Sequence, residues 1–173
     1  MKTRTRGSWI WVAFATLLFS SCGYQIGATK PVEMDGVEAI FVEVPDNRTQ
    51  YPRLESKLGN HLADAVIQDS MYRLTSRAQA DAVLKSKISQ VSYSKVRSSI
   101  TDGLSPEELR MMVTVNWQVV SRVDGHVLMQ GVDREDSQFF LDGSRLTTAR
   151  DNAFPDALSR VSRKVVSHLS SAF

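Results

Sequence analysis

Between Leu109 and Val120, every second residue from Leu109 onward is apolar, a pattern that few folds accommodate. One set of alternate positions is entirely apolar: Leu109, Met111, Val113, Val115, Trp117 and Val119. The intervening set is mostly polar: Arg110, Met112, Thr114, Asn116 and Gln118. Because successive side chains of a strand point to opposite faces, this period of two predicts a half-buried antiparallel strand. Other parts of the chain must then cover its apolar face.

Further strands are predicted on both sides of this one. Enrichment in β-branched and aromatic residues and the position of turn residues predict strands over 38–44, 71–74, 82–97 and 127–136. Asp124–Gly125 is expected to form the hairpin turn before residue 127. Within 82–97 the apolar positions change parity, so we expect a β-bulge near Ser89–Gln90. Loops are predicted over 46–52, 98–108 and 139–146.

Two amphipathic helices are predicted from apolar residues that recur every three or four positions. The first begins at about Arg53 and shares one face among Leu54, Leu58, Leu62, Ala65 and Val66. The second ends the chain and shares Phe154, Ala157, Leu158, Val161, Val165 and Leu169. Either this helix begins with Pro155 in its first turn, or it starts near Thr148 and is kinked at the proline.

The order of these elements predicts an α+β fold. We expect a two-layer sandwich in which a mixed sheet of four to five strands is covered on one face by two helices. The opposite face of the sheet would then display Lys85, Lys87, Arg110, Thr114, Asn116 and Gln118.

The N-terminus has the pattern of a bacterial lipoprotein signal. Lys2, Arg4 and Arg6 precede an apolar run from Trp9 to Phe19, which is too short to span a bilayer, since a spanning helix needs about 20 residues. Ser21 then stands before Cys22, the single cysteine of the chain. We therefore predict a signal peptide at 1–21, a lipidated tether at 22–36 and one domain at 37–173.

Lipidation of Cys22 would give the protein its membrane anchor. The thiol would carry a diacylglycerol and the freed amine a third acyl chain such as palmitate, and two chains already anchor a protein stably without crossing the membrane. The alternative is an ordinary secreted or inner-membrane-anchored protein with an unpaired Cys22. That would leave a free thiol in an oxidising compartment.

The basic character of the sequence belongs to its signal. The chain has 21 basic and 19 acidic residues, and three of the basic residues precede residue 7. The mature part therefore has 18 basic and 19 acidic side chains, a net charge near −1. This balance, together with the exported location, argues against a nucleic-acid partner, and with Cys22 acylated no cysteine remains for a disulfide or a zinc site.

The sequence contains no catalytic motif that we could identify. His61, His126 and His168 are scattered, and the first and last are predicted to lie on helix flanks in structural roles. Asp133, Glu135 and Asp136 suggest either a metal site or a solvated strand end, and Arg134 between them favours the second. We expect no enzyme activity, no metal and no cofactor.

A basic strip is the candidate binding feature. Between residues 82 and 101 there are four cations and no acid: Lys85, Lys87, Lys95 and Arg97. Such a strip could bind the phosphates of a glycolipid. Equally, it could be a solvated strand whose lysines prevent pairing with other chains.

Several short motifs, taken in order, resemble the LptE family of lipopolysaccharide-assembly lipoproteins. The matching stretches are Cys22-Gly23-Tyr24, residues 40–45 followed by Asn47-Arg48-Thr49, Tyr72-Arg73-Leu74 before residues 80–84, residues 112–116, and Ala149-Arg150-Asp151-Asn152. Together they span nearly the whole mature chain.

The resemblance implies a two-helix, four-stranded sandwich anchored on the periplasmic side of the outer membrane. It implies a non-catalytic protein that binds and plugs the LptD barrel and assists lipopolysaccharide assembly at the cell surface. On this basis Lys85, Lys87 and Arg150 are the predicted lipopolysaccharide contacts, with ordinary surface charge as the alternative for each. A competing function is a periplasm-facing lipoprotein that activates a peptidoglycan synthase or serves as a secretion-complex subunit.

Overall fold

The computed structural model describes residues 30–97, 107–141 and 146–171. The predicted signal peptide and Cys22 lie outside these residues. In chain order the elements are the 3-10 helix η1 (Val32–Met34), β1 (Ala39–Val42), β2 (Asp46–Asn47), α2 (Leu54–Asp69), β3 (Arg73–Leu74), β4 (Ala82–Arg97), β5 (Glu107–Ser121), β6 (Val127–Leu141) and α3 (Leu146–Ser170).

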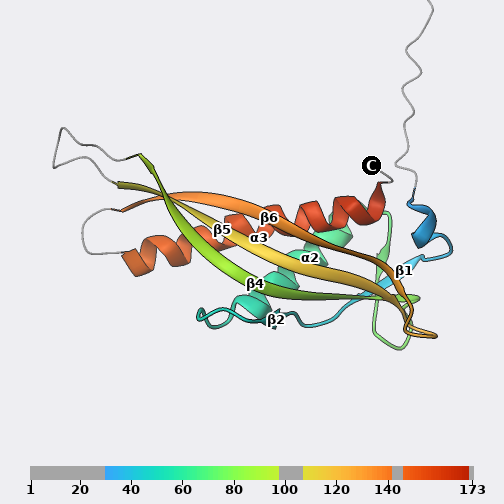
Figure 1. The fold of residues 1–173 in the computed structure, drawn as a ribbon. Coiled ribbons are helices and arrows are strands. Elements are labelled where there is room, and N and C mark those ends of the chain that lie inside the picture. The colour runs from blue at the N-terminus through green and yellow to red at the C-terminus, as the bar shows by residue number, and fades with distance from the viewer. Residues whose placement is uncertain (1–29, 98–106, 142–145, 172–173) are drawn as a thin grey trace, which may run out of the picture.

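These elements form an α+β fold, as predicted. One mixed sheet has the strand order β3-β1-β4-β5-β6, with β2 paired to β4 off this path. β1 is parallel to β3 and β4, whereas β4, β5 and β6 are antiparallel and make up most of the sheet. α2 and α3 lie together along one side of these long strands (Figure 1). The sheet has six strands rather than four or five, because the two-residue strand β2 lies in the segment predicted as a loop over 46–52, whereas β3 falls within the strand predicted over 71–74.

The core lies between the sheet and the helices. The five residues predicted for the inner face of α2 are all buried, from Leu54 at 2% exposure to Ala65 at 5%. The six predicted for α3 are buried as well. α3 begins at Leu146, so Pro155 lies inside the helix, and a start at Pro155 is wrong.

β4 contains the predicted bulge. Its pairing with β5 shifts register between Ile88 and Gln90. The Ser89 hydroxyl donates to the Thr114 carbonyl at 3.2 Å and to Asn116 Oδ1 at 3.0 Å. The extra residue lets the two halves of β4, with opposite apolar parity in the sequence, bury the same face.

The alternation in β5 is also confirmed, with one exception. The predicted inner residues are buried, or half-buried at Leu109. Thr114, expected to be displayed on the outer face, is only 8% exposed. Its cross-strand neighbours are Gln90 and Arg134, whose longer side chains screen a short one between them.

Two loop boundaries were wrong. β6 continues to Leu141 and α3 begins at Leu146, so residues 139–141 and 146 of the loop predicted over 139–146 are regular structure, and 142–145 lie outside the described residues. Phe139 is 6% exposed and packs edge-on against Tyr93, with ring centroids 6.3 Å apart. Of the loop predicted over 98–108, residues 98–106 lie outside the described part, and Glu107 and Glu108 belong to β5.

The end of the predicted tether packs against the domain. Met34 of η1 is fully buried, and Lys30 Nζ donates to the Val37 carbonyl at 2.7 Å and lies 5.0 Å from the Tyr72 ring centroid. Figure 1 shows η1 at the same end of the molecule as the C-terminus of α3. No helix in the described part of the chain is long and apolar enough to cross a bilayer.

Candidate functional site

The open face of the sheet carries a shallow polar trough of about 600 Å³. Before the bulge, the side chains of the odd-numbered residues of β4 point away from the helices. In the register with β5, Lys85 lies opposite Gln118 and Lys87 opposite Asn116. Gln130 of β6 continues the row beyond Gln118. Its polar lining is Asp46, Lys85, Lys87, Asn116, Gln118 and Gln130.

The chemistry of the trough suits a phosphorylated sugar. Two ammonium groups can each donate three hydrogen bonds to phosphate oxygens. The side-chain amides of Asn116, Gln118 and Gln130 can donate to and accept from hydroxyl groups. Asp46 of β2 lies beside Lys87 in the strand register, and its carboxylate reduces the positive charge at that end of the trough.

Arg150 lies elsewhere. It belongs to α3, which covers the opposite face of the sheet, so the structure does not bring it together with Lys85 and Lys87. Its guanidinium lies 4.9 Å from the centroid of the Tyr51 ring, and Nη2 forms a 3.1 Å ion pair with Asp151. The three predicted contacts therefore belong to two separate surfaces.

Arg150 borders an aromatic cluster that the sequence did not reveal. Tyr51 packs against Phe154 with centroids 5.4 Å apart and against Tyr93 at 6.2 Å. Burial raises the pKa of Tyr51, but hydrogen bonds from Tyr93 and Gln50 and the charge of Arg150 outweigh it, so the pKa is lowered. Burial and the bond to Tyr51 raise the pKa of Tyr93. Tyr51 lies in a predicted loop, and a loop has no periodic pattern of apolar residues from which a packing role could be predicted.

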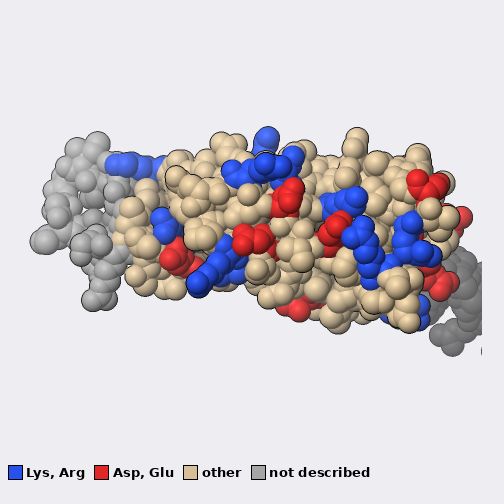
Figure 2. Space-filling view, turned by 90° about the horizontal axis from the view of Figure 1, so that it is seen from below, with Lys and Arg blue, Asp and Glu red and all other residues tan. Residues whose placement is uncertain are grey.

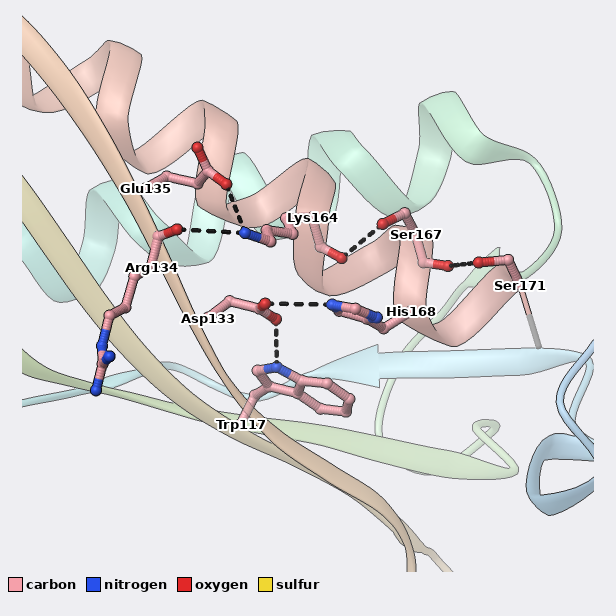
Figure 3. A network of polar contacts seen from close by, with 8 residues as sticks. All are labelled: Trp117, Asp133, Arg134, Glu135, Lys164, Ser167, His168 and Ser171. Atoms are coloured by element: carbon pink, nitrogen blue, oxygen red, sulfur yellow. Dashed lines mark hydrogen bonds and ion pairs between the residues drawn. The ribbon is translucent and has the colours of Figure 1, made fainter. Parts of the chain in front are cut away.

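A second polar network joins the sheet to α3 (Figure 3). Asp133 is 5% exposed, and its Oδ2 accepts a 2.7 Å hydrogen bond from Trp117 Nε1. Its other oxygen lies 3.2 Å from His168 Nε2. The His168 ring stacks on Trp117, with centroids 6.2 Å apart and planes 19° from parallel. His168 therefore has a structural partner, and the alternating pattern of β6 did not predict a buried carboxylate on its inner face.

The neighbouring carboxylates have partners of their own. Glu135 pairs with Lys164 of α3 at 2.8 Å, which raises the pKa of Lys164, and Asp136 pairs with Arg110 on the open face at 3.3 Å. The interpretation of these acids as a solvated strand end was wrong for Asp133, because two partners on the inner face hold it there. Within the described ranges no three acidic, histidine or cysteine side chains are grouped to hold a metal ion.

Charge is distributed in small groups. Figure 2 shows Lys and Arg in separate clusters with Asp and Glu between them along the face that it draws. On that face the cations do not form one continuous patch. On that face, recognition of an anion must therefore depend on small local groups of cations.

Solved structures of distant sequence share the fold. PelC from Paraburkholderia phytofirmans, solved as a dodecamer, matches with a TM-score of 0.53 and 15% identity over 83% of this chain and 95% of its own. The hypothetical protein CT253 from Chlamydia trachomatis gives 0.54 and 9% over 77% and 95%. A putative neuraminyllactose-binding hemagglutinin homolog from Helicobacter pylori gives 0.52 and 14% over 83% and 90%. At these identities the likeness concerns the fold alone.

The family of the chain follows from its sequence. No curated protein matches it. A model of the LptE family, described as lipopolysaccharide-assembly, matches residues 37–169. That range takes in every strand of the sheet and both long helices, up to the last turn of α3. The chain therefore belongs to the LptE lipopolysaccharide-assembly family.

Proposed function

We propose that this chain is an outer-membrane lipoprotein that binds and plugs the LptD barrel and assists the delivery of lipopolysaccharide to the cell surface. The observation that carries the proposal is the family match over residues 37–169. The work is binding, and no catalytic step is assigned to it.

In this proposal residues 1–21 are removed as a signal peptide and Cys22 is acylated. Residues 22–36 lead from the lipid to the domain at 37–173, with Met34 already packed on it. The acyl chains insert into the periplasmic leaflet of the outer membrane, and each buried methylene stabilises the anchor by about 0.8 kcal/mol. A Cys22→Ser variant would lose this anchor.

The lipopolysaccharide contacts are proposed in two places. The polar trough offers Lys85 and Lys87 to the phosphates of the lipid and the nearby amides to its sugars. Arg150 is the second proposed phosphate contact. Arg150 is the weaker candidate of the two, because its guanidinium already forms an ion pair with Asp151 and packs over the Tyr51 ring.

The experiment that tests the proposal is affinity purification of the lipidated protein from outer membranes in mild detergent, followed by mass spectrometry. We expect an LptD-like barrel in stoichiometric amount. A parallel purification from outer membranes that lack the tagged protein controls for adventitious capture of abundant porins. Recovery of a peptidoglycan synthase, of secretion-complex subunits or of no partner would contradict the proposal.

A further inference from the structure

The sheet stops short on the outer side of β1. β3 pairs only with Ala39 and Ile40, whereas β1 continues to Val42. The Thr75 amide still donates to the Ile40 carbonyl, and the chain then turns away, with Gln79 bonded back to Ser76. One strand position beside the end of β1 is therefore vacant.

The backbone of Val42 faces this vacancy. Ile40 bonds toward β3, whereas the Glu43 amide donates to the Leu84 carbonyl of β4 on the other side. Because amide and carbonyl directions alternate along a parallel strand, those of Val42 point outward. Among the residues that the structure describes, none forms a backbone hydrogen bond with Val42 on that side. Unpaired strand edges of this kind are templates for an incoming strand.

A groove of about 400 Å³ runs along the same edge, between the end of β1 and α2. The α2 side of the groove is formed by Glu55, Ser56, Gly59, Asn60 and Ala63, and the Pro45 ring packs on Gly59 at one point of it. Apolar residues form the strand side: Phe41, Val42, Val44, Pro45 and Leu74. Val44, two residues beyond the end of β1, is 74% exposed and leaves an apolar surface at this end of the groove.

The charges of the groove are acidic. Glu43 and Glu55 both line it, and no lysine or arginine is among the described residues that do. Glu55 is held by a 2.9 Å hydrogen bond from Asn47, and Glu43 by a 3.1 Å pair with the exposed Arg77. A partner that enters the groove would therefore meet apolar side chains together with two carboxylates.

We propose that this groove binds an extended peptide segment of a partner protein, in which apolar residues alternate with lysine or arginine, and that the segment adds a strand beside Val42. Main-chain hydrogen bonds to Val42 would supply affinity, and the apolar groove and its carboxylates would select the sequence. This inference goes beyond lipopolysaccharide and the barrel, and it does not depend on either.

The test uses the lipidated full chain in mild detergent and a fluorescent ten-residue peptide of alternating valine and lysine. Fluorescence anisotropy should show saturable binding, and the Val42 amide should become protected from hydrogen exchange. A peptide of alternating valine and glutamate should bind at least tenfold more weakly. A valine–lysine peptide interrupted by two prolines should also lose affinity, because proline cannot donate a backbone hydrogen bond.

A matched pair of variants locates the site. Ala63→Arg places a long cation in the groove and should weaken binding at least tenfold, whereas Gln68→Arg, exposed on the same helix and outside the groove, should leave it unchanged. Equal binding to both variants, or protection along β6 instead of at Val42, would overturn the proposal. If Ala63→Arg fails to fold, the site of amide protection in the unaltered chain decides the question alone.

Discussion

Trp117 packs its indole ring over Gly131 on the neighbouring strand, where a Cβ atom would lie 2.6 Å from ring atom Cζ2. Only glycine allows the ring to lie there. From that position Nε1 reaches the buried carboxylate of Asp133, and His168 stacks on the ring. The absence of one methyl group thus permits the contact between sheet and α3 on which this end of the core depends.

A Gly131→Ala substitution should therefore displace the indole. We expect a loss of about 1–3 kcal/mol in the free energy of unfolding, as for other overpacked cores. Urea denaturation measures this loss, and the fluorescence of Trp117, the only tryptophan outside residues 1–21, should report a wetter ring. Val132→Ala, at the exposed next position, should change the free energy by less than about 0.5 kcal/mol. Similar losses in both variants would contradict the steric argument.

Tyr72 gives a pH dependence with a definite sign. Burial, then the charge of Asp69, raises its pKa to about 12, and its hydroxyl donates to the Leu169 carbonyl. The unfolded chain ionises this group near pH 10, so its contribution to stability is complete below pH 10 and is lost as the pH rises toward 12.

The parent protein should lose more unfolding free energy between pH 8 and pH 11.5 than the Tyr72→Phe variant does, by about 1–2 kcal/mol. Urea denaturation at the two pH values measures it, and the other tyrosines cancel in the comparison. An unchanged pH dependence in the variant would mean that Tyr72 titrates normally. At pH 8 the variant should already lose about 1 kcal/mol, because the Leu169 carbonyl loses its hydrogen bond from the Tyr72 hydroxyl.

At the scale of the elements, β4 depends on one inserted residue. Ser89 gives the strand two parities that bury a single face, and its hydroxyl makes two hydrogen bonds to β5. The effect of the serine side chain on stability can therefore be separated from the effect of having an extra residue at this position. Its presence sets the face of every side chain on one half of the strand.

Ser89→Ala should cost only about 1 kcal/mol, the net value of a hydrogen bond, with the fold intact. Deletion of Ser89 should instead turn one half of β4 to the wrong face and expose residues such as Leu84 and Ile88. We expect it to abolish cooperative thermal unfolding measured by circular dichroism. A deletion variant that unfolds cooperatively, with stability like that of Ser89→Ala, would show that the bulge does not set the register.

The same element shows what could be predicted from sequence. The parity of apolar positions predicted the bulge and the inner face of β5, and strand-forming composition with flanking turn residues predicted the bounds of β4, because each depends on neighbouring residues in one segment. The features that the sequence did not predict are those that depend on tertiary contacts. Phe139 belongs to a strand because it meets Tyr93, and Asp133 is buried because Trp117 and His168 come from distant parts of the chain. Likewise, Lys85 and Lys87 share a face by parity, whereas Arg150 lies on a helix whose placement the sequence does not specify.

For the whole molecule, the helices cover one face of the sheet and leave the other, with its polar trough, open. Lys85 and Lys87 lie on the open side, where each is half-buried among its strand neighbours. If the trough holds lipid phosphates, its charge rather than the net charge of the protein should control binding. Two exposed charge contacts together are worth about 1.4 kcal/mol, or tenfold in affinity.

The double variant Lys85→Gln/Lys87→Gln should therefore bind purified lipopolysaccharide about tenfold more weakly, with a shallower dependence on salt. Lys57→Gln/Arg163→Gln removes the same charge from the two helices and should leave affinity unchanged. Lipopolysaccharide stripped of its phosphates should bind the parent and the first double variant equally. Equal weakening by both double variants would point to long-range charge and against the trough.

The length of the strands has a mechanical consequence. Fifteen residues of β5 at about 3.3 Å each extend for about 50 Å, and η1, next to the N-terminal lead, lies at one end of them. A continuous sheet backed by a 25-residue helix resists bending. If the proposed lipid anchor holds the chain ahead of Lys30, a tilt of about 10° there would displace the opposite end by about 9 Å. Small rotations at the anchored end would thus be amplified into movements as large as a sugar ring.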